Sequence, residues 1–72
     1  MKVLDLVVLQ KNLPTHRLKK GDVGTVVHVH PNNGCEVEFV TLDGKTLAVV
    51  SLKSSEIRKA GKRQIPHVRA VA

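Results

Sequence analysis

The stretch that determines the fold runs from Asp22 to Leu52 and reads DVGTVVHVHPNNGCEVEFVTLDGKTLAVVSL. It holds three short apolar runs rich in valine, at 22–30, 35–42 and 45–52, with turn-forming residues between them. Valine is β-branched and favours strands, and none of the runs shows a sustained helical period. The stretch therefore predicts three consecutive antiparallel strands.

The two connections inside this stretch are short. Asp43-Gly44 separates the last two runs by two residues, which predicts a type I′ hairpin turn with positive φ at both positions. Pro31-Asn32-Asn33-Gly34 has the composition of a turn and joins the first two runs. We therefore expect a meander in which neighbouring strands pair.

On either side of this stretch the chain adds one strand at 3–9 and a brief last strand at 56–58. Lys53-Ser54-Ser55 is too short for an α-helix and predicts a single 3₁₀ turn. These elements predict an all-β fold, a small five-stranded SH3-like barrel over residues 1–58. The remaining residues, 59–72, are expected to form a basic, extended C-terminal tail.

The longest connection is the loop 10–20. Pro14 opposes strand pairing there, because proline cannot donate a ladder hydrogen bond. Leu13 and Leu18 are the apolar residues of the loop, and we expect them to fold back onto the barrel as plugs.

Length and composition limit the class of protein. Seventy-two residues make one domain with a modest core, so self-association into a homo-oligomer is expected to bury more surface. The single cysteine, Cys35, cannot form an internal disulfide and fits a reducing compartment. No signal-peptide pattern and no apolar stretch near the roughly 20 residues of a membrane span is present. We expect a soluble, cytoplasmic protein with no membrane partner.

The charge is concentrated near the C-terminus. The formal net charge is +6, but residues 1–58 carry eight lysines and arginines against all six acids. The tail carries four basic residues and no acid. The basic tail makes nucleic acid the alternative partner. The loop lysines and the tail would contact it, through Lys19, Lys20, Lys59, Lys62, Arg63 and Arg69. One phenylalanine and no tyrosine or tryptophan leave few platforms for stacking bases, which disfavours this alternative.

The strands differ in how their apolar residues alternate. In the run 35–42, Val37 and Phe39 alternate with Glu36 and Glu38, the pattern of a half-buried strand. The runs 3–9 and 45–52 instead carry apolar residues on both faces, and a small barrel has only one interior. We therefore expect a protein-contact surface, with its rim included, made of Val3, Val7, Leu9, Leu47, Val49, Arg17, Lys19 and Lys20.

Catalytic and metal chemistry find little support in the sequence. No nucleophile motif or phosphate-binding loop occurs, and Glu36 and Glu38 are interpreted as solvent-facing, so we expect neither an enzyme nor a cofactor. His28 and His30 lie at i and i+2, so a strand places both on one face, and Cys35 follows the turn. Two imidazoles and a thiolate close together would suit zinc or copper. A fourth ligand is not evident, so we expect an exposed histidine pair and no metal.

Several segments resemble a small bacterial family known only as domain of unknown function 4926. They are 4–8, Leu13-Pro14, LKKGDVGTV at 18–26, EVEF at 36–39, Asp43-Gly44 and LKSSEIR at 52–58. The resemblance covers about residues 1–58 and implies a stand-alone SH3-like barrel; members beside toxin-like genes imply an antitoxin or immunity role. GDVGTV at 21–26 is also similar to the start of the KOW motif, and the chain resembles SH3-like subunits that dock onto larger enzymes.

The glycine motif also has a purely structural interpretation. Gly21 and Gly24 permit a sharp turn into a strand and a close backbone approach, and Asp22 can hydrogen-bond nearby amides. The sequence thus predicts a non-catalytic accessory or regulatory protein that binds another polypeptide, antitoxin- or immunity-like, and self-associates. The alternative is a KOW-like nucleic-acid-binding module.

Overall fold

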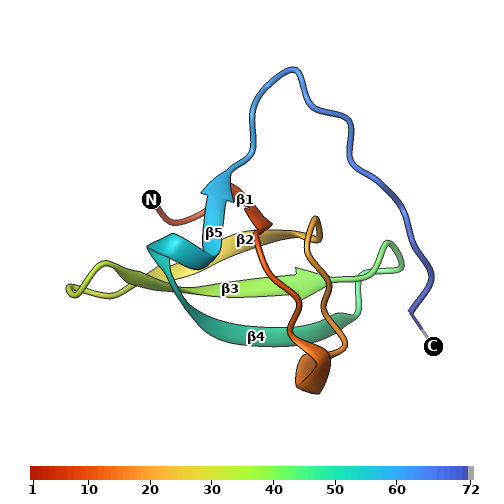
Figure 1. Ribbon diagram of the computed structural model, residues 1–72, viewed down its shortest axis with the longest axis horizontal. Helices are drawn as coiled ribbons and strands as arrows, with labels where there is room; N and C mark the ends of the chain where they lie inside the picture. Colours follow the sequence, from red (N-terminus) through yellow and green to blue (C-terminus); the bar gives the residue numbers. More distant parts are fainter. Residues whose placement is uncertain (72) are drawn as a thin grey trace.

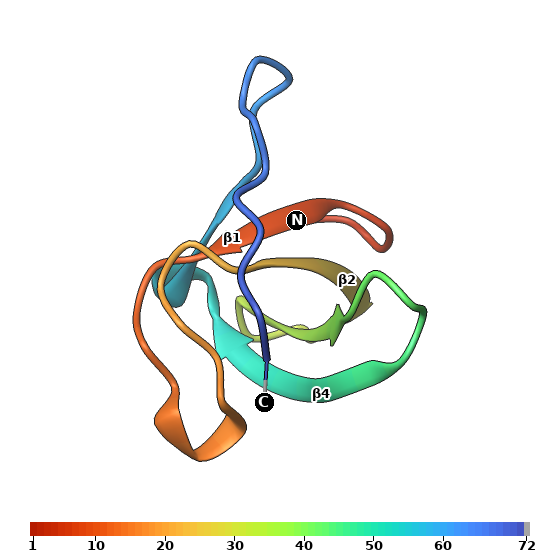
Figure 2. The same ribbon diagram turned by 90° about the vertical axis from the view of Figure 1, so that its right-hand side faces the viewer.

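The computed structural model describes residues 1–71, which form five strands and two single-turn 3₁₀ helices. Along the chain they are β1 (Leu6–Leu9), η1 (Pro14–His16), β2 (Val23–Val29), β3 (Gly34–Val40), β4 (Thr46–Lys53), η2 (Ser54–Glu56) and β5 (Ile57–Lys59). The strands form one antiparallel sheet in the order β4-β3-β2-β1-β5 (Figure 1). The sheet curls, so β1 and β4 lie on opposite sides of the interior (Figure 2). The predicted all-β fold of five strands is confirmed.

Ten buried side chains fill the interior of the curled sheet: Val7, Leu9, Leu18, Val26, Cys35, Val37, Phe39, Val50, Leu52 and Ile57. Leu18 is 2% exposed and Leu13 packs against this core, so both predicted plugs of the first loop are confirmed. The two leucines also bond to each other through their backbones, which holds the turn of η1 closed.

Strand β1 begins later than the sequence predicts. Leu4 has φ 75°, in the left-handed region that β-branched and bulky residues avoid, so the extended chain cannot start at Val3. The Asp5 carboxylate accepts the Lys2 amide hydrogen at 2.9 Å and closes a turn there. The predicted strand 3–9 is therefore shortened to Leu6–Leu9.

The β3–β4 turn is not the predicted type I′ turn. Only Gly44 has positive φ, 86°, and its amide donates to the Thr41 carbonyl at 2.9 Å. This is the longer hairpin in which an ordinary turn precedes one left-handed residue. In the other hairpin Asn33 takes the left-handed position, with φ 67°.

Two β-bulges shift the register of the sheet. In the β2–β3 pair, Val26 lies opposite Val37 and His28 opposite Glu36, so Val27 is an extra residue. In the β3–β4 pair, Phe39 lies opposite Ala48 and Val40 opposite Thr46, so Leu47 is extra. A bulge reverses which face the following side chains occupy, and each of these two affects a candidate site.

The tail leaves β5, arches away from the sheet and returns to the end of the barrel beside the β3–β4 turn (Figures 1 and 2). The Ala60 amide still pairs with the Leu6 carbonyl at 2.9 Å, and a turn at 61–64 then begins the arch. The Gln64 side chain stabilises that turn by accepting hydrogen bonds from Arg58 and from the Gly61 amide. Among residues 1–71 no helix has the length and apolar character needed to cross a membrane.

Candidate functional site

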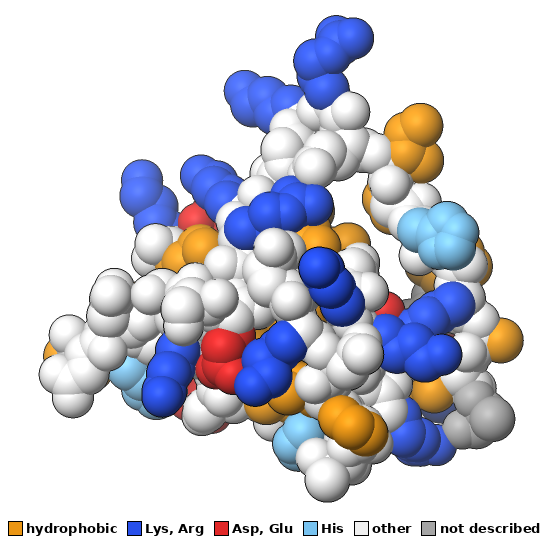
Figure 3. Space-filling model, in the orientation of Figure 1, with side chains coloured by type: hydrophobic (Ala, Val, Ile, Leu, Met, Phe, Trp, Pro, Cys, Tyr) orange, Lys and Arg blue, Asp and Glu red, His pale blue; other side chains and the backbone are white. Residues whose placement is uncertain are grey.

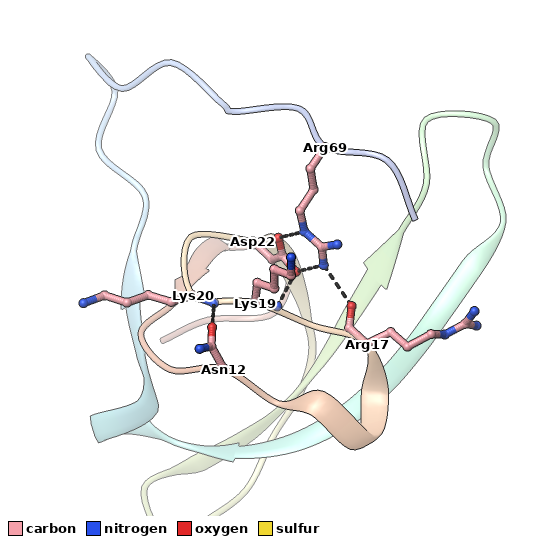
Figure 4. Close-up of polar contacts among 6 residues, drawn as sticks. All are labelled: Asn12, Arg17, Lys19, Lys20, Asp22 and Arg69. Atoms are coloured by element: carbon pink, nitrogen blue, oxygen red, sulfur yellow. Dashed lines mark hydrogen bonds and ion pairs between the residues drawn. The ribbon is translucent and has the colours of Figure 1, made fainter. Parts of the chain in front are cut away.

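The returning tail is held to the barrel by one arginine. Arg69 donates from Nε to Asp22 Oδ1 at 2.8 Å and from Nη2 to Oδ2 at 2.5 Å, a two-pronged contact (Figure 4). The same Nη2 donates to the Arg17 carbonyl at 2.9 Å. The Arg69 and Asp22 side chains are only 26% and 18% exposed, which limits screening by solvent. We call this contact the tail latch.

Hydrogen bonds within the first loop also hold Asp22 in place, independently of the tail. The Lys19 amide donates to Asp22 Oδ2 at 2.8 Å and the Asp22 amide donates to the Lys19 carbonyl, as the structural interpretation of the glycine motif predicts. Burial raises the pKa of Asp22, but the hydrogen bonds from Arg69 and from the Lys19 amide, with the charges of both residues, outweigh burial. The net result is a pKa below the ordinary value, so Asp22 is an anion at neutral pH and attracts the tail.

An open groove of about 710 Å³ lies between the tail and the end of the barrel. Figure 3 shows the tail standing clear of the barrel, with this opening between them. Its volume falls within the roughly 300–1,000 Å³ of ligand-binding pockets. Apolar side chains from three parts of the chain line it: Val23, Val40, Leu42, Leu47, Pro66 and Val68. We call it the tail groove.

Several of these apolar side chains have no cover. Leu42 is 92% exposed, Val68 71% and Val40 53%. Polar groups are interspersed, since Arg17, Asp22 and Lys45 also line the groove. An apolar surface with a few charged groups, open along one side, is suited to an extended chain with apolar side chains.

The predicted contact surface is wrong in part. Val7 and Leu9 are both 0% exposed and belong to the core, so neither can contact a partner. The face of β1 that turns outward carries Leu6, which is 54% exposed. A strand with apolar residues on both faces does not specify which face is buried. The sequence analysis placed Val7 and Leu9 on the exposed face, and the structure buries them.

The other predicted contact residues are divided between two regions. Leu47 and Arg17 line the tail groove, Leu47 because of its bulge. Val3 and Val49 are exposed, but Val49 lies on the outer face of the sheet. Thr25 and Glu38 separate it from Leu6 in the same cross-strand row, whereas Val8, Val23 and Val40 lie in the next row of that face, and Val23 and Val40 line the groove.

Basic side chains are spread over the face that Figure 3 shows, from the apex of the tail to the first loop, with few acids between them. The predicted nucleic-acid residues Lys19, Lys20, Lys59, Lys62 and Arg63 are all exposed. Arg69 differs, because it is bound to Asp22 in the tail latch. Lys59 lies 4.0 Å from the Asp5 carboxylate.

The candidate metal ligands are arranged differently from the prediction. Cys35 is 2% exposed in the core, and burial raises the pKa of its thiol, so it does not lie with the histidines. Glu36 lies beside His28 and His30 instead, and these three side chains could hold a metal ion. The other outward carboxylate, Glu38, accepts a hydrogen bond from the Thr46 hydroxyl at 2.7 Å.

Sequence reasoning found Leu47 and Arg17 but missed the other residues that build the groove and did not predict the latch. Asp22 and Arg69 are 47 positions apart, and nothing local in the sequence pairs them. Val40 and Leu42 end a predicted strand, and only the path of the tail makes them part of a site. The sequence held one signal for the latch. Asp22 follows the basic pair Lys19 and Lys20, and the tail carries four basic residues and no acid.

Comparison with known proteins gives one match. The model of a domain of unknown function, DUF4926, matches residues 3–59. The chain belongs to this family. The match includes the whole sheet and ends where the tail begins, so the tail groove combines residues inside the match with a segment outside it. No curated protein and no solved structure is significantly similar to the chain.

Proposed function

We propose that this DUF4926 protein is a non-catalytic binding module that holds an extended segment of another polypeptide in the tail groove. One observation carries the proposal: exposed apolar side chains from β2, the β3–β4 turn and the tail surround one open groove. Burying a side chain such as Leu42 or Val40 on a partner is favourable by about 25 cal/mol per Å² of apolar surface. The tail latch supports binding because it fixes one wall of the groove in advance.

The groove can be tested with two valines of equal exposure. Val40 is 53% exposed in the groove, and Val49 is 50% exposed on a part of the sheet that does not line the groove. We would select peptides from a displayed random library on the full chain and measure their affinities by anisotropy of a fluorescent label. Val40→Asp should weaken binding at least about tenfold, which corresponds to about 1.4 kcal/mol, and Val49→Asp should leave it unchanged.

Two results would contradict the proposal. In the first, the selected peptides bind Val40→Asp as tightly as the natural chain. In the second, Val49→Asp weakens binding and Val40→Asp does not, which would place the binding surface around Val49, outside the tail groove. Both variants change exposed residues, so their unfolding midpoints should stay close to that of the natural chain.

The identity of the polypeptide is part of the same proposal. An antitoxin- or immunity-like role in the cytoplasm is one form of such binding, with a toxin as the partner. A second copy of the chain is another, and would explain how so small a core is supplemented. Sedimentation velocity of the natural chain and of Val40→Asp separates these forms, because only self-association through the groove makes the variant smaller in solution.

Nucleic acid is a second candidate, favoured by the basic face in Figure 3. Lys62 and Arg63 lie in the turn at 61–64 and are exposed, and the sequence has no acid after Glu56. Anisotropy of labelled RNA and DNA should then show binding that weakens steeply with salt and is lost in the double variant Lys62→Gln/Arg63→Gln. Lys45→Gln/Lys53→Gln removes the same charge elsewhere and is the matched control. Equal binding by both double variants would argue against a polyanion site on the tail.

A further inference from the structure

Three potential metal ligands meet on the outer face of the β2–β3 hairpin. Their ligand atoms, one nitrogen each from His28 and His30 and one oxygen from Glu36, all lie within 4.8 Å of one another. His30 Nε2 lies 3.6 Å from Glu36 Oε2, and the two imidazole rings stand edge to face with centroids 5.0 Å apart. These three residues form what we call the hairpin triad, which shares no residue with the tail groove.

The β-bulge at Val27 creates this arrangement. Regular pairing onward from Val26 and Val37 would place Val27 opposite Glu36 and His28 opposite Cys35, whose side chain points into the core. The extra residue instead places His28 directly opposite Glu36, and His30, two residues on, then shares that outer face. Bulges that redirect a side chain are frequent next to functional sites.

The separations suit a small divalent ion. Zinc binds imidazole nitrogen and carboxylate oxygen at about 2.0–2.2 Å, so two ligands in a tetrahedral site lie about 3.3–3.6 Å apart. The His30–Glu36 distance of 3.6 Å already meets this requirement. The other distances between ligand atoms must shorten by at most about 1.5 Å, and rotation of the exposed His28 ring can supply this change.

The triad is also accessible and uncommitted. The side chains of His30 and Glu36 are 37% and 38% exposed, so an ion can reach them from solvent. Among residues 1–71 the Glu36 carboxylate makes no hydrogen bond or ion pair besides its contact with His30. The neighbouring Glu38, by contrast, is bound to Thr46.

We propose that His28, His30 and Glu36 bind a divalent transition-metal ion, with Zn²⁺ the best match to two imidazoles and one carboxylate. Three protein ligands leave at least one coordination position open. Water fills it in the isolated chain, and a side chain of a partner can take that place. This reverses the expectation of no metal, because the sequence paired the histidines with Cys35 and overlooked Glu36.

The test is calorimetric titration of the full, untagged chain with zinc chloride. Saturable binding is expected, and His28→Asn, His30→Asn and Glu36→Gln should each weaken it by more than the roughly 10–100-fold typical of losing an outer-shell partner. His67→Asn and Glu38→Gln are matched controls of the same residue types and should leave the affinity unchanged. Zinc should also raise the midpoint of thermal unfolding of the natural chain and of the controls.

Histidine side-chain NMR gives a second, independent readout. Zinc should shift the imidazole resonances of His28 and His30 and leave those of His16 and His67 in place. The proposal is overturned if no saturable binding tighter than about 1 mM is seen. It is equally overturned if binding survives in the triad variants, or if the tail histidine His67 is the residue that shifts.

Discussion

Replacing Gly24 by alanine should destabilise the fold by about 2 kcal/mol, because β2 has no room for a side chain there. A Cβ at this position would lie 2.5 Å from Val37 Cγ1, 2.9 Å from Phe39 Cε1 and 3.0 Å from the Glu38 carbonyl oxygen. Carbon atoms in good contact are about 3.5–4.0 Å apart, so the overlap with Val37 is about 1 Å.

The neighbours of Gly24 cannot easily move aside. Val37 is 0% exposed and Phe39 3%, and the third contact is backbone. Overpacking of this kind costs about 1–3 kcal/mol, and three simultaneous contacts put Gly24→Ala in the upper part of that range. The smaller entropy of unfolded alanine returns roughly 0.4–1 kcal/mol, which gives the net value of about 2 kcal/mol.

A loss of 2 kcal/mol lowers the unfolding midpoint of a domain this size by about 8–16 °C. Circular dichroism is the appropriate assay, since the chain has no tryptophan or tyrosine for intrinsic fluorescence. Gly61→Ala is the control, because its Cβ would meet only the Gln64 side chain, at 3.4 Å or more. The double variant Gly24→Ala/Val37→Ala should be less destabilised than the sum of its single changes, since removing Val37 Cγ1 relieves the overlap.

An alanine at position 24 that leaves the midpoint unchanged would refute the close packing of β2 on β3. Strict additivity with Val37→Ala would refute the specific overlap. Either result would also reopen a ligand-binding role for the GDVGTV motif, which we explain structurally.

Three further predictions concern the thiol, the tail and the groove. Cys35 should react with a thiol reagent only after unfolding in urea, because burial keeps it from solvent and raises the pKa of its thiol; rapid reaction of the folded chain would show that it is not in the core. The tail latch should hold at neutral pH and release in acid, because the pKa of Asp22 is lowered in the folded chain. The Asp22 carboxylate therefore contributes to stability above its unfolded pKa of about 3.9, and this contribution is lost as pH falls through the folded pKa. Backbone NMR relaxation of the tail should show this release, and Asp22→Asn should show a mobile tail at every pH. Leu42→Asp should leave the unfolding midpoint unchanged to within the equivalent of about 0.5 kcal/mol, because Leu42 is 92% exposed; a larger drop by circular dichroism would mean that the groove is filled in the free chain.

Much of the fold was predictable because local signals agreed. The alternation of Val37 and Phe39 with Glu36 and Glu38 fixed the buried face of β3, and turn residues marked both hairpins. The fine structure of the turn at Asp43-Gly44 was wrong, because a two-residue and a longer hairpin loop share the same composition. The buried face of β1 was predicted wrongly, because this strand is apolar on both faces.

The candidate sites were harder to predict, for two physical reasons. The bulge at Val27 has no sequence signature, yet it decides whether His28 faces Cys35 or Glu36. The tail latch is a contact between residues 47 positions apart, which no periodicity can show. Both sites therefore depend on register and long-range closure, whereas the strands depend on local pattern.

The groove itself is best tested by mapping a bound peptide. A selected peptide would be titrated into the full, isotopically labelled chain, and the backbone amide resonances would be followed by NMR. Polypeptide binding in the tail groove predicts that the shifts concentrate at the β3–β4 turn, at the start of β2 and at residues 66–71. Shifts confined to the part of the sheet around Val49, or to the loop 10–20 and the turn at 61–64, with the β3–β4 turn unmoved, would contradict it.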